Sequence, residues 1–287
     1  MTATPQTADR VRQITVFILS LLAIAGATFG SGAFGGTPIQ DAAGGALSAD
    51  ATLIAPAGPA FGIWSVIYLG LFAYAVWQLF PSQGARTVHR RVGYLIALSM
   101  LLNAAWIGSV QLGRVGLSVL VIVVLLFILG FTFALLQRTP RDVDTTAARV
   151  TEAVVLDGTI GLYLGWVTIA TAANVAAWLT DLGFTGWGIN PDVWGVIVVA
   201  VAAVVGVATA IAGRGRLTPA ISLSWGLAWL AVARLSGEPE SQAVGISAAL
   251  AAVVVLAAAV IARVVAQRSG YRPADNAYTR ASVPDQA

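Results

Sequence analysis

Between Arg114 and Arg138 the chain reads VGLSVLVIVVLLFILGFTFALLQ, a run of 23 residues (115–137) without a charged side chain. The hydrocarbon core of a bilayer is about 30 Å thick, so a helix of about 20 apolar residues crosses it. Backbone amides inside lipid must be hydrogen-bonded within the protein, and a helix achieves this within one segment. This run therefore predicts a transmembrane α-helix.

The rest of the 287-residue chain repeats this pattern. Hydrophobic residues make up 58% of it and charged residues only 10%, whereas a soluble domain has about 25% charged residues. The short alternating strands of a membrane β-barrel are absent from the sequence. We therefore predict an all-α fold, a polytopic transmembrane helical bundle with about eight spans at residues 13–31, 60–80, 92–111, 115–137, 149–178, 192–212, 217–235 and 242–265.

The basic residues, all of them arginine, predict the orientation of this bundle. Fourteen of the sixteen lie before the first span, in alternate connections or after the last span, and only Arg114 and Arg234 lie on the opposite side. Because arginine favours the cytoplasmic side, we expect a multi-pass protein of the cell (plasma or inner) membrane with both termini cytoplasmic. The connection 31–59 should then lie outside. Removal of the first span as a signal peptide would leave the same alternation, so charge does not decide whether it is retained.

Several residue types are scarce or missing, and this excludes much chemistry. The chain has no cysteine and no lysine, which removes thiolate catalysis, cysteine-bound metals and Schiff bases. His89 is the only histidine, so haem held by two histidines is excluded as well. We expect no metal site and no covalently bound cofactor. The net charge of +3 does not indicate nucleic-acid binding, because the arginines follow the membrane topology.

Aromatic and amide residues recur at helical spacing in the second, third and fifth spans. With a rise of about 1.5 Å per residue, all of them fall in the outer half of the membrane. Tryptophans that face lipid gather at the interfaces, whereas several of these lie deeper and need partners inside the protein. The spacing fits either an aromatic pocket beneath the 31–59 connection or ordinary helix packing. The residues are Phe61, Trp64 and Tyr68, then Asn103 and Trp106, then Tyr163, Trp166, Ala170, Asn174 and Trp178.

Three of these segments resemble motifs of the TspO family, the tryptophan-rich sensory proteins and translocator proteins. They are PAGPAFGIWSVIY at 56–68, LNAAW at 102–106 and YLGWVTIATAANVAAW at 163–178. The resemblance covers about residues 13–178, the family's five-helix unit. The chain departs from the family in splitting the paired prolines into Pro56 and Pro59 and in adding three spans. We expect a TspO-like unit at 1–178, three additional helices at 179–266 and a disordered cytoplasmic tail at 267–287.

The resemblance implies a membrane receptor or sensor that binds a flat hydrophobic small molecule, such as a porphyrin or a sterol. It implies that Trp64, Tyr68, Asn103, Trp106, Trp166, Ala170 and Asn174 line the pocket, with Phe61 and Tyr163 on the same helix faces. Indole faces suit planar π-systems and amides suit carboxylates, so the residue types agree with such a ligand. The alternatives are a secondary transporter of a hydrophobic or amphipathic metabolite and an enzyme that promotes porphyrin breakdown. No catalytic residues are expected, because no nucleophile and base form a recognisable pair.

Asp157 and two pairs of glycines also stand out. Asp157 lies about 12 Å into the membrane from Arg149, where an acidic residue is either a functional group, here a possible proton relay, or a helix-bonded acid. Gly26 with Gly30, and Gly161 with Gly165, have the G-x-x-x-G spacing that permits close helix contact. Each pair fits either packing within the chain or the seam of a homodimer.

Overall fold

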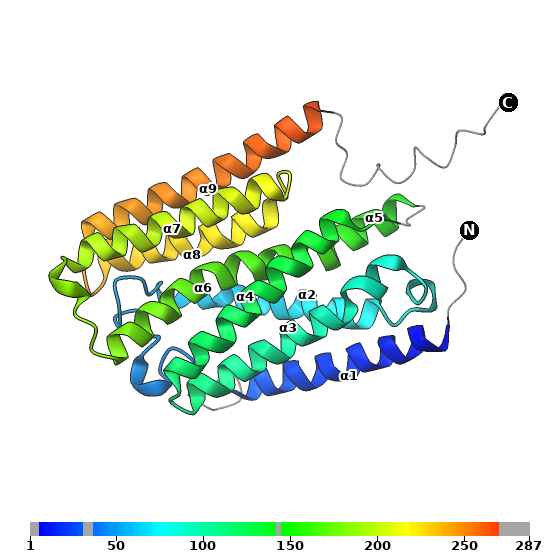
Figure 1. Ribbon diagram of the computed structural model, residues 1–287, viewed down its shortest axis with the longest axis horizontal. Helices are drawn as coiled ribbons and strands as arrows, with labels where there is room; N and C mark the ends of the chain where they lie inside the picture. Colours follow the sequence, from blue (N-terminus) through cyan, green and yellow to red (C-terminus); the bar gives the residue numbers. More distant parts are fainter. Residues whose placement is uncertain (1–5, 31–36, 142–144, 270–287) are drawn as a thin grey trace.

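The computed structural model describes residues 6–30, 37–141 and 145–269. Every regular element in these residues is helical, so the all-α prediction is confirmed (Figure 1). The α-helices are α1 Thr7–Gly30, α2 Ile63–Trp77, α3 Thr87–Gln111, α4 Val115–Arg138, α5 Thr146–Glu152, α6 Thr159–Asp181, α7 Pro191–Ala212, α8 Leu217–Ser236 and α9 Gln242–Arg268. A π-helical segment, Ala153–Gly158, joins α5 to α6.

Seven helical stretches among the described residues are long and apolar enough to cross a membrane. One of them combines α5, the π-helical segment and α6 into Thr146–Asp181, which extends the predicted fifth span at both ends. The predicted seventh span corresponds to α8, which has 20 residues but falls outside the apolar set. Of the predicted tail, 267–287, the first two residues belong to α9, and 270–287 lie outside the described residues.

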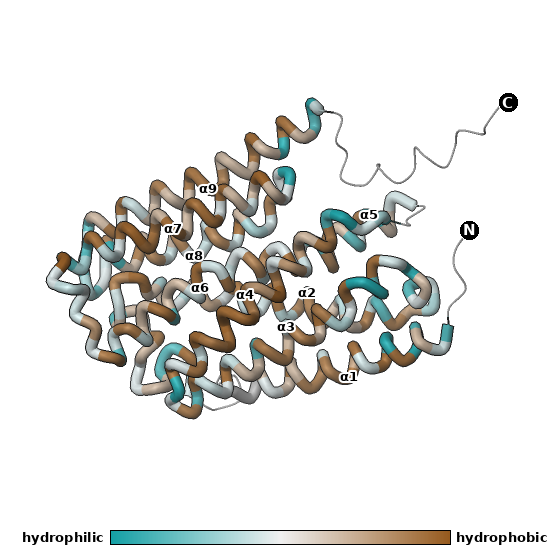
Figure 2. The backbone as a smooth tube through the Cα atoms, viewed as in Figure 1, coloured by the Kyte–Doolittle hydropathy of each residue, from teal (hydrophilic) through white to brown (hydrophobic). Residues whose placement is uncertain are grey.

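The lower hydropathy of α8 follows from its position inside the bundle. It packs against α6, α7 and α9, and its buried residues include Ser222, Ser224 and Arg234. Helices that face lipid need apolar side chains all along, whereas a helix covered by other helices can carry polar ones that find protein partners. Figure 2 shows hydrophilic residues gathered at the two ends of the bundle and mostly apolar ones between them.

Close backbone contact joins α6 to α8. A Cβ atom at Gly165 would lie 2.0 Å from the carbonyl oxygen of Pro219, and one at Gly161 would lie 2.0 Å from Oγ1 of Thr218. This G-x-x-x-G pair therefore serves packing within the chain. Gly26 of the other pair faces Ala104 of α3 at 3.8 Å, which is ordinary contact. The homodimer stays a prediction.

The described part of the first connection, residues 37–57, is held by α8. The side chain of Arg234 is fully buried and donates hydrogen bonds to the carbonyl oxygens of Thr52 (3.2 Å) and Ala49. Trp225 donates from Nε1 to the carbonyl of Ala60 (2.9 Å), and the amide of Ala57 donates to the carbonyl of Trp229 (3.2 Å). The connection is therefore an ordered cover, with both ends of segment 49–60 bound to α8.

The seam between α6 and α8 predicts the effect of one methyl group. Gly165→Ala places Cβ against the Pro219 backbone, which cannot rotate away, and should destabilise the protein by about 1–3 kcal/mol. The matched control is Gly130→Ala in α4, where no atom lies within 4 Å of the added Cβ. Thermal unfolding in detergent should show a lower midpoint for Gly165→Ala only. Equal midpoints for the two variants would contradict the close approach.

The contacts of Arg234 predict a second effect, on the cover. Arg234→Met removes charged donors from several carbonyl groups and should lower the unfolding free energy by about 2 kcal/mol or more. Because the chain has no cysteine, Ala55→Cys places a single buried reporter within the cover. Maleimide labelling of this reporter should be faster in the Arg234→Met background. Arg114→Met, which removes the other arginine of that side, should leave the labelling rate unchanged.

Candidate functional site

Six aromatic side chains from three helical segments meet in one place, and we call them the aromatic cluster. Trp64 lies at its centre and contacts four other rings. Its ring is stacked on those of Tyr68 (centroids 5.2 Å apart) and Trp106 (6.3 Å), and it meets Tyr163 (5.8 Å) and Trp166 (6.1 Å) edge to face. The sixth member, Phe61, precedes α2 and meets Trp166 edge to face at 5.7 Å.

The polar atoms around the cluster are mostly hydrogen-bonded to one another. Asn103 donates from Nδ2 to the hydroxyl of Tyr68 at 2.7 Å. Trp106 donates from Nε1 to Oδ1 of Asn174 at 2.6 Å, and Nδ2 of Asn174 donates to the hydroxyl of Ser118 in α4 at 2.9 Å. These bonds fix the faces of α3, α4 and α6 relative to one another, because unpaired polar atoms at this depth are costly.

Two buried polar atoms of this region have no hydrogen-bond partner. They are the indole nitrogen Nε1 of Trp166, a donor, and the amide oxygen Oδ1 of Asn103, an acceptor. The exposed fraction of Trp166 is 1% and that of Asn103 is 2%, so neither residue is open to solvent. An unpaired buried polar group costs about 1–3 kcal/mol, and such groups in a native protein call for an explanation.

A small cavity lies between the aromatic cluster and the first connection. Its volume is about 30 Å³, room for about one water molecule. Phe61, Trp64, Trp106, Trp166 and Ala170 line it from the helices, and residues of 46–56 close it from above. The nine predicted pocket residues are thus assembled, either in the cluster, along the cavity or in the hydrogen bonds around them. Trp178 is separate and packs against Gly116 of α4.

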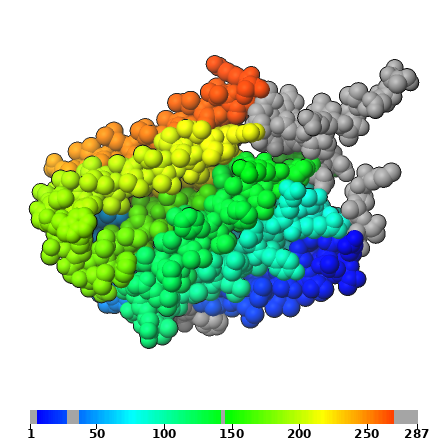
Figure 3. All heavy atoms as spheres, viewed as in Figure 1, coloured from blue at the N-terminus to red at the C-terminus, as the bar shows by residue number. Residues whose placement is uncertain are grey.

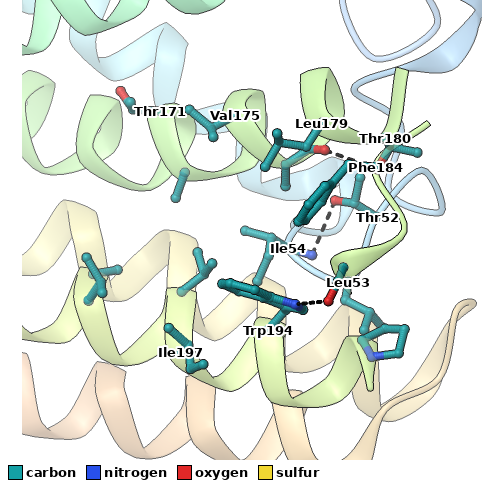
Figure 4. A pocket seen from close by; sticks show the side chains of 18 of the residues that line it. Thr52, Leu53, Ile54, Thr171, Val175, Leu179, Thr180, Phe184, Trp194 and Ile197 are labelled. Carbon is teal, nitrogen blue, oxygen red and sulfur yellow. Dashed lines mark hydrogen bonds between the residues drawn. The ribbon is translucent and has the colours of Figure 1, made fainter. Parts of the chain in front are cut away.

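A much larger apolar cleft lies on the other side of α6. Its volume is about 820 Å³, and α6 and α7 form its walls. Thr52, Leu53 and Ile54 of the first connection reach into it (Figure 4). In Figure 3 the first connection is visible at the bottom of a hollow in the molecular surface. The sequence analysis did not anticipate this cleft.

The end of the cleft beside the connection between α6 and α7 carries three aromatic rings that were not among the predicted site residues. Phe184, Trp187 and Trp194 meet edge to face, with centroids 5.3–6.2 Å apart. Trp194 donates from Nε1 to the carbonyl of Gly186 at 3.0 Å, which holds the connection before α7 against that helix. Trp187 is 78% exposed, as expected of a tryptophan at a membrane interface. The signal available in the sequence was the presence of three aromatic residues in eleven positions, 184–194, in and beside a glycine-rich connection.

Asp157, the predicted relay residue, lies at the other end of the bundle. It belongs to the π-helical segment and forms ion pairs with Arg141 (2.8 Å) and Arg216 (2.6 Å). Within the described residues, no group of three or more histidine, cysteine, aspartate or glutamate side chains is placed to hold a metal ion.

Comparison with known proteins gives a match over most of the chain. Residues 17–261 match the model of a family described as TSPO-like protein. The matched region includes every helix of the aromatic cluster and continues through α7, α8 and most of α9. No curated protein and no solved structure matches the chain. The chain is a multi-pass membrane protein and belongs to the family of TSPO-like proteins.

Proposed function

We propose that this protein is a membrane receptor that binds a flat hydrophobic ligand, a tetrapyrrole or a molecule of similar shape, at the aromatic cluster. Membership of the TSPO-like family indicates the role of a membrane sensor or receptor. Proteins of this family are generally non-enzymatic. The observation that carries the finer proposal is the convergence of six rings beside two buried polar atoms without partners. Such an arrangement is more than helix packing requires.

The chemistry of the cluster suits a planar ligand with polar edges. Indole and phenol rings bind flat π-systems through their faces. The free N–H of Trp166 can donate to a ligand carboxylate, and the free oxygen of Asn103 can accept from a ring N–H. Pairing these two atoms with a ligand would remove the cost of leaving them buried and unpaired.

The cluster must open to admit such a ligand. The cavity holds about 30 Å³, whereas small-molecule sites usually enclose about 300–1,000 Å³. The first connection is the element that would have to move, because it covers the cavity. Its segment 49–60 is bound at both ends to α8. Ligand binding would then alter contacts between the connection and α8, which gives the receptor an output. By the arginine distribution, this opening faces the extracytoplasmic side.

Secondary transport with Asp157 as a proton relay stays a prediction. Asp157 forms ion pairs with two arginines, and a role in proton transfer would require those ion pairs to separate. The proposed receptor needs no such step.

The decisive experiment compares two pairs of tryptophans on opposite sides of α6. Protoporphyrin binding is followed by the absorbance of the porphyrin, which does not depend on the number of tryptophans. The variant Trp64→Ala/Trp166→Ala should bind at least tenfold more weakly, because it removes the centre of the cluster. The matched variant Trp187→Ala/Trp194→Ala removes two indoles from the cleft and should bind as the parent does. The reverse pattern would assign the ligand to the cleft.

A finer prediction concerns the free indole N–H. Trp166→Phe keeps an aromatic ring and removes the donor, so protoporphyrin should bind about tenfold more weakly if its carboxylate accepts from Nε1. The dimethyl ester of protoporphyrin has no carboxylate, so the same substitution should weaken its binding much less. Equal losses for the acid and the ester would mean that Trp166 contributes only its ring.

A further inference from the structure

Charged side chains form a connected network at the end of the bundle that carries α5 and the start of α1 (Figure 1). Glu152 is paired with Arg86 and Arg141, and Asp157 is paired with Arg141 (2.8 Å) and Arg216 (2.6 Å). Burial alone would lower the pKa of Arg141, but the carboxylates of Asp157 and Glu152 raise it above its usual value. The network joins α3, α5, the π-helical segment and the residue before α8 through ion pairs.

A cavity of about 460 Å³ opens beside this network, and we call it the basic cavity. Among the residues that the structure describes, four arginines and two carboxylates line it. Arg149 comes from α5, and Arg263 comes from α9. Leu217 and Thr218, the first residues of α8, also line the cavity. The amino end of a helix carries partial positive charge and amides that have no partner within the helix, which adds to the attraction for an anion.

The backbone brings these arginines together. Gly215 has a positive φ of 75°, and a Cβ there would lie 2.1 Å from the amide nitrogen of Arg263. The turn before α8 therefore touches α9 directly, next to Arg216. On the opposite wall, Asp157 lies in the π-helical segment, a distortion that is frequent at functional sites. Helices from three parts of the chain thus meet at one cavity that is lined by arginines.

Apolar side chains beside the basic cavity are directed outward. Val150 and Val154 are 57% and 64% exposed, and Ile221, which lines the cavity, is 47% exposed. These side chains lie at the edge of spanning helices, where the outside of the protein meets lipid. The arginine distribution predicts that this end is cytoplasmic, the side on which anionic lipids are enriched.

We propose that the basic cavity binds the phosphate-bearing headgroup of an anionic phospholipid from the cytoplasmic leaflet. The arginines that line the cavity and the start of α8 hold the headgroup phosphate, since guanidinium groups pair well with phosphate oxygens. The exposed side chains of Val150, Val154 and Ile221 accompany the acyl chains. The ion pairs of Asp157 and Glu152 keep Arg141 and Arg216 in place behind the bound headgroup.

The test compares two double variants that remove the same charge. Arg149→Gln/Arg263→Gln takes two exposed arginines from the basic cavity, and Arg138→Gln/Arg268→Gln takes two exposed arginines from the same end outside it. The purified full chain in neutral detergent is titrated with short-chain phosphatidylglycerol, and bound lipid is counted by native mass spectrometry. The cavity variant should bind the lipid about tenfold more weakly than the parent. The control variant should bind it as the parent does.

Two further titrations separate the possible sources of the phosphate group. Phosphatidylcholine of the same chain length tests the need for net negative charge and should bind more weakly than phosphatidylglycerol. Inorganic phosphate should compete only at much higher concentration, because it lacks acyl chains. Competition by phosphate at the same concentration as the lipid would overturn the lipid assignment. Equal lipid binding by the two double variants would overturn the site.

Discussion

The close contact between α6 and α8 at Gly161, Gly165 and Pro219 determines where α8 lies relative to both candidate sites. Without side chains at the glycines, the two helix backbones approach to a distance that even one methyl group would prevent. This approach places Trp225 and Arg234 of α8 against the connection that covers the aromatic cluster. It also places the inner end of α8 against the π-helical segment, where Arg216 meets Asp157. Both candidate sites therefore depend on one seam.

The interior of the bundle shows how polar groups are accommodated inside a membrane protein. Around the aromatic cluster, amides, hydroxyls and indoles are paired across α2, α3, α4 and α6. The exceptions, Nε1 of Trp166 and Oδ1 of Asn103, lie where the rings converge. At the predicted cytoplasmic end, carboxylates are paired with arginines instead. The first arrangement suits an aromatic ligand with polar edges, and the second suits an anion.

The sequence predicted the helices and the faces of the cluster well, because length, apolar runs and periodic spacing are local properties. Trp64 and Trp166 were placed on the right faces for the same reason. Local patterns do not report which neighbour covers a face. The burial of α8 inside the bundle therefore could not be predicted, and neither could the cleft between α6 and α7. Arg234 was visible only as an exception to the arginine rule, and its partners in the cover, backbone carbonyls 182 and 185 residues away, leave no pattern in the sequence.

The exception at Arg234 has a physical explanation that also bears on function. An arginine on the side predicted to be extracytoplasmic opposes the topological preference, but here its guanidinium is hydrogen-bonded to carbonyl groups of the cover and of the turn at Glu238–Pro239. A fully buried guanidinium is stable only while those carbonyls stay in place. Opening of the cover must therefore either carry Arg234 with it or supply the group with water. In both cases the contacts at the C-terminal end of α8 change. Because α8 is a continuous helix about 30 Å long, a rigid element connects this end to Arg216 at the other end.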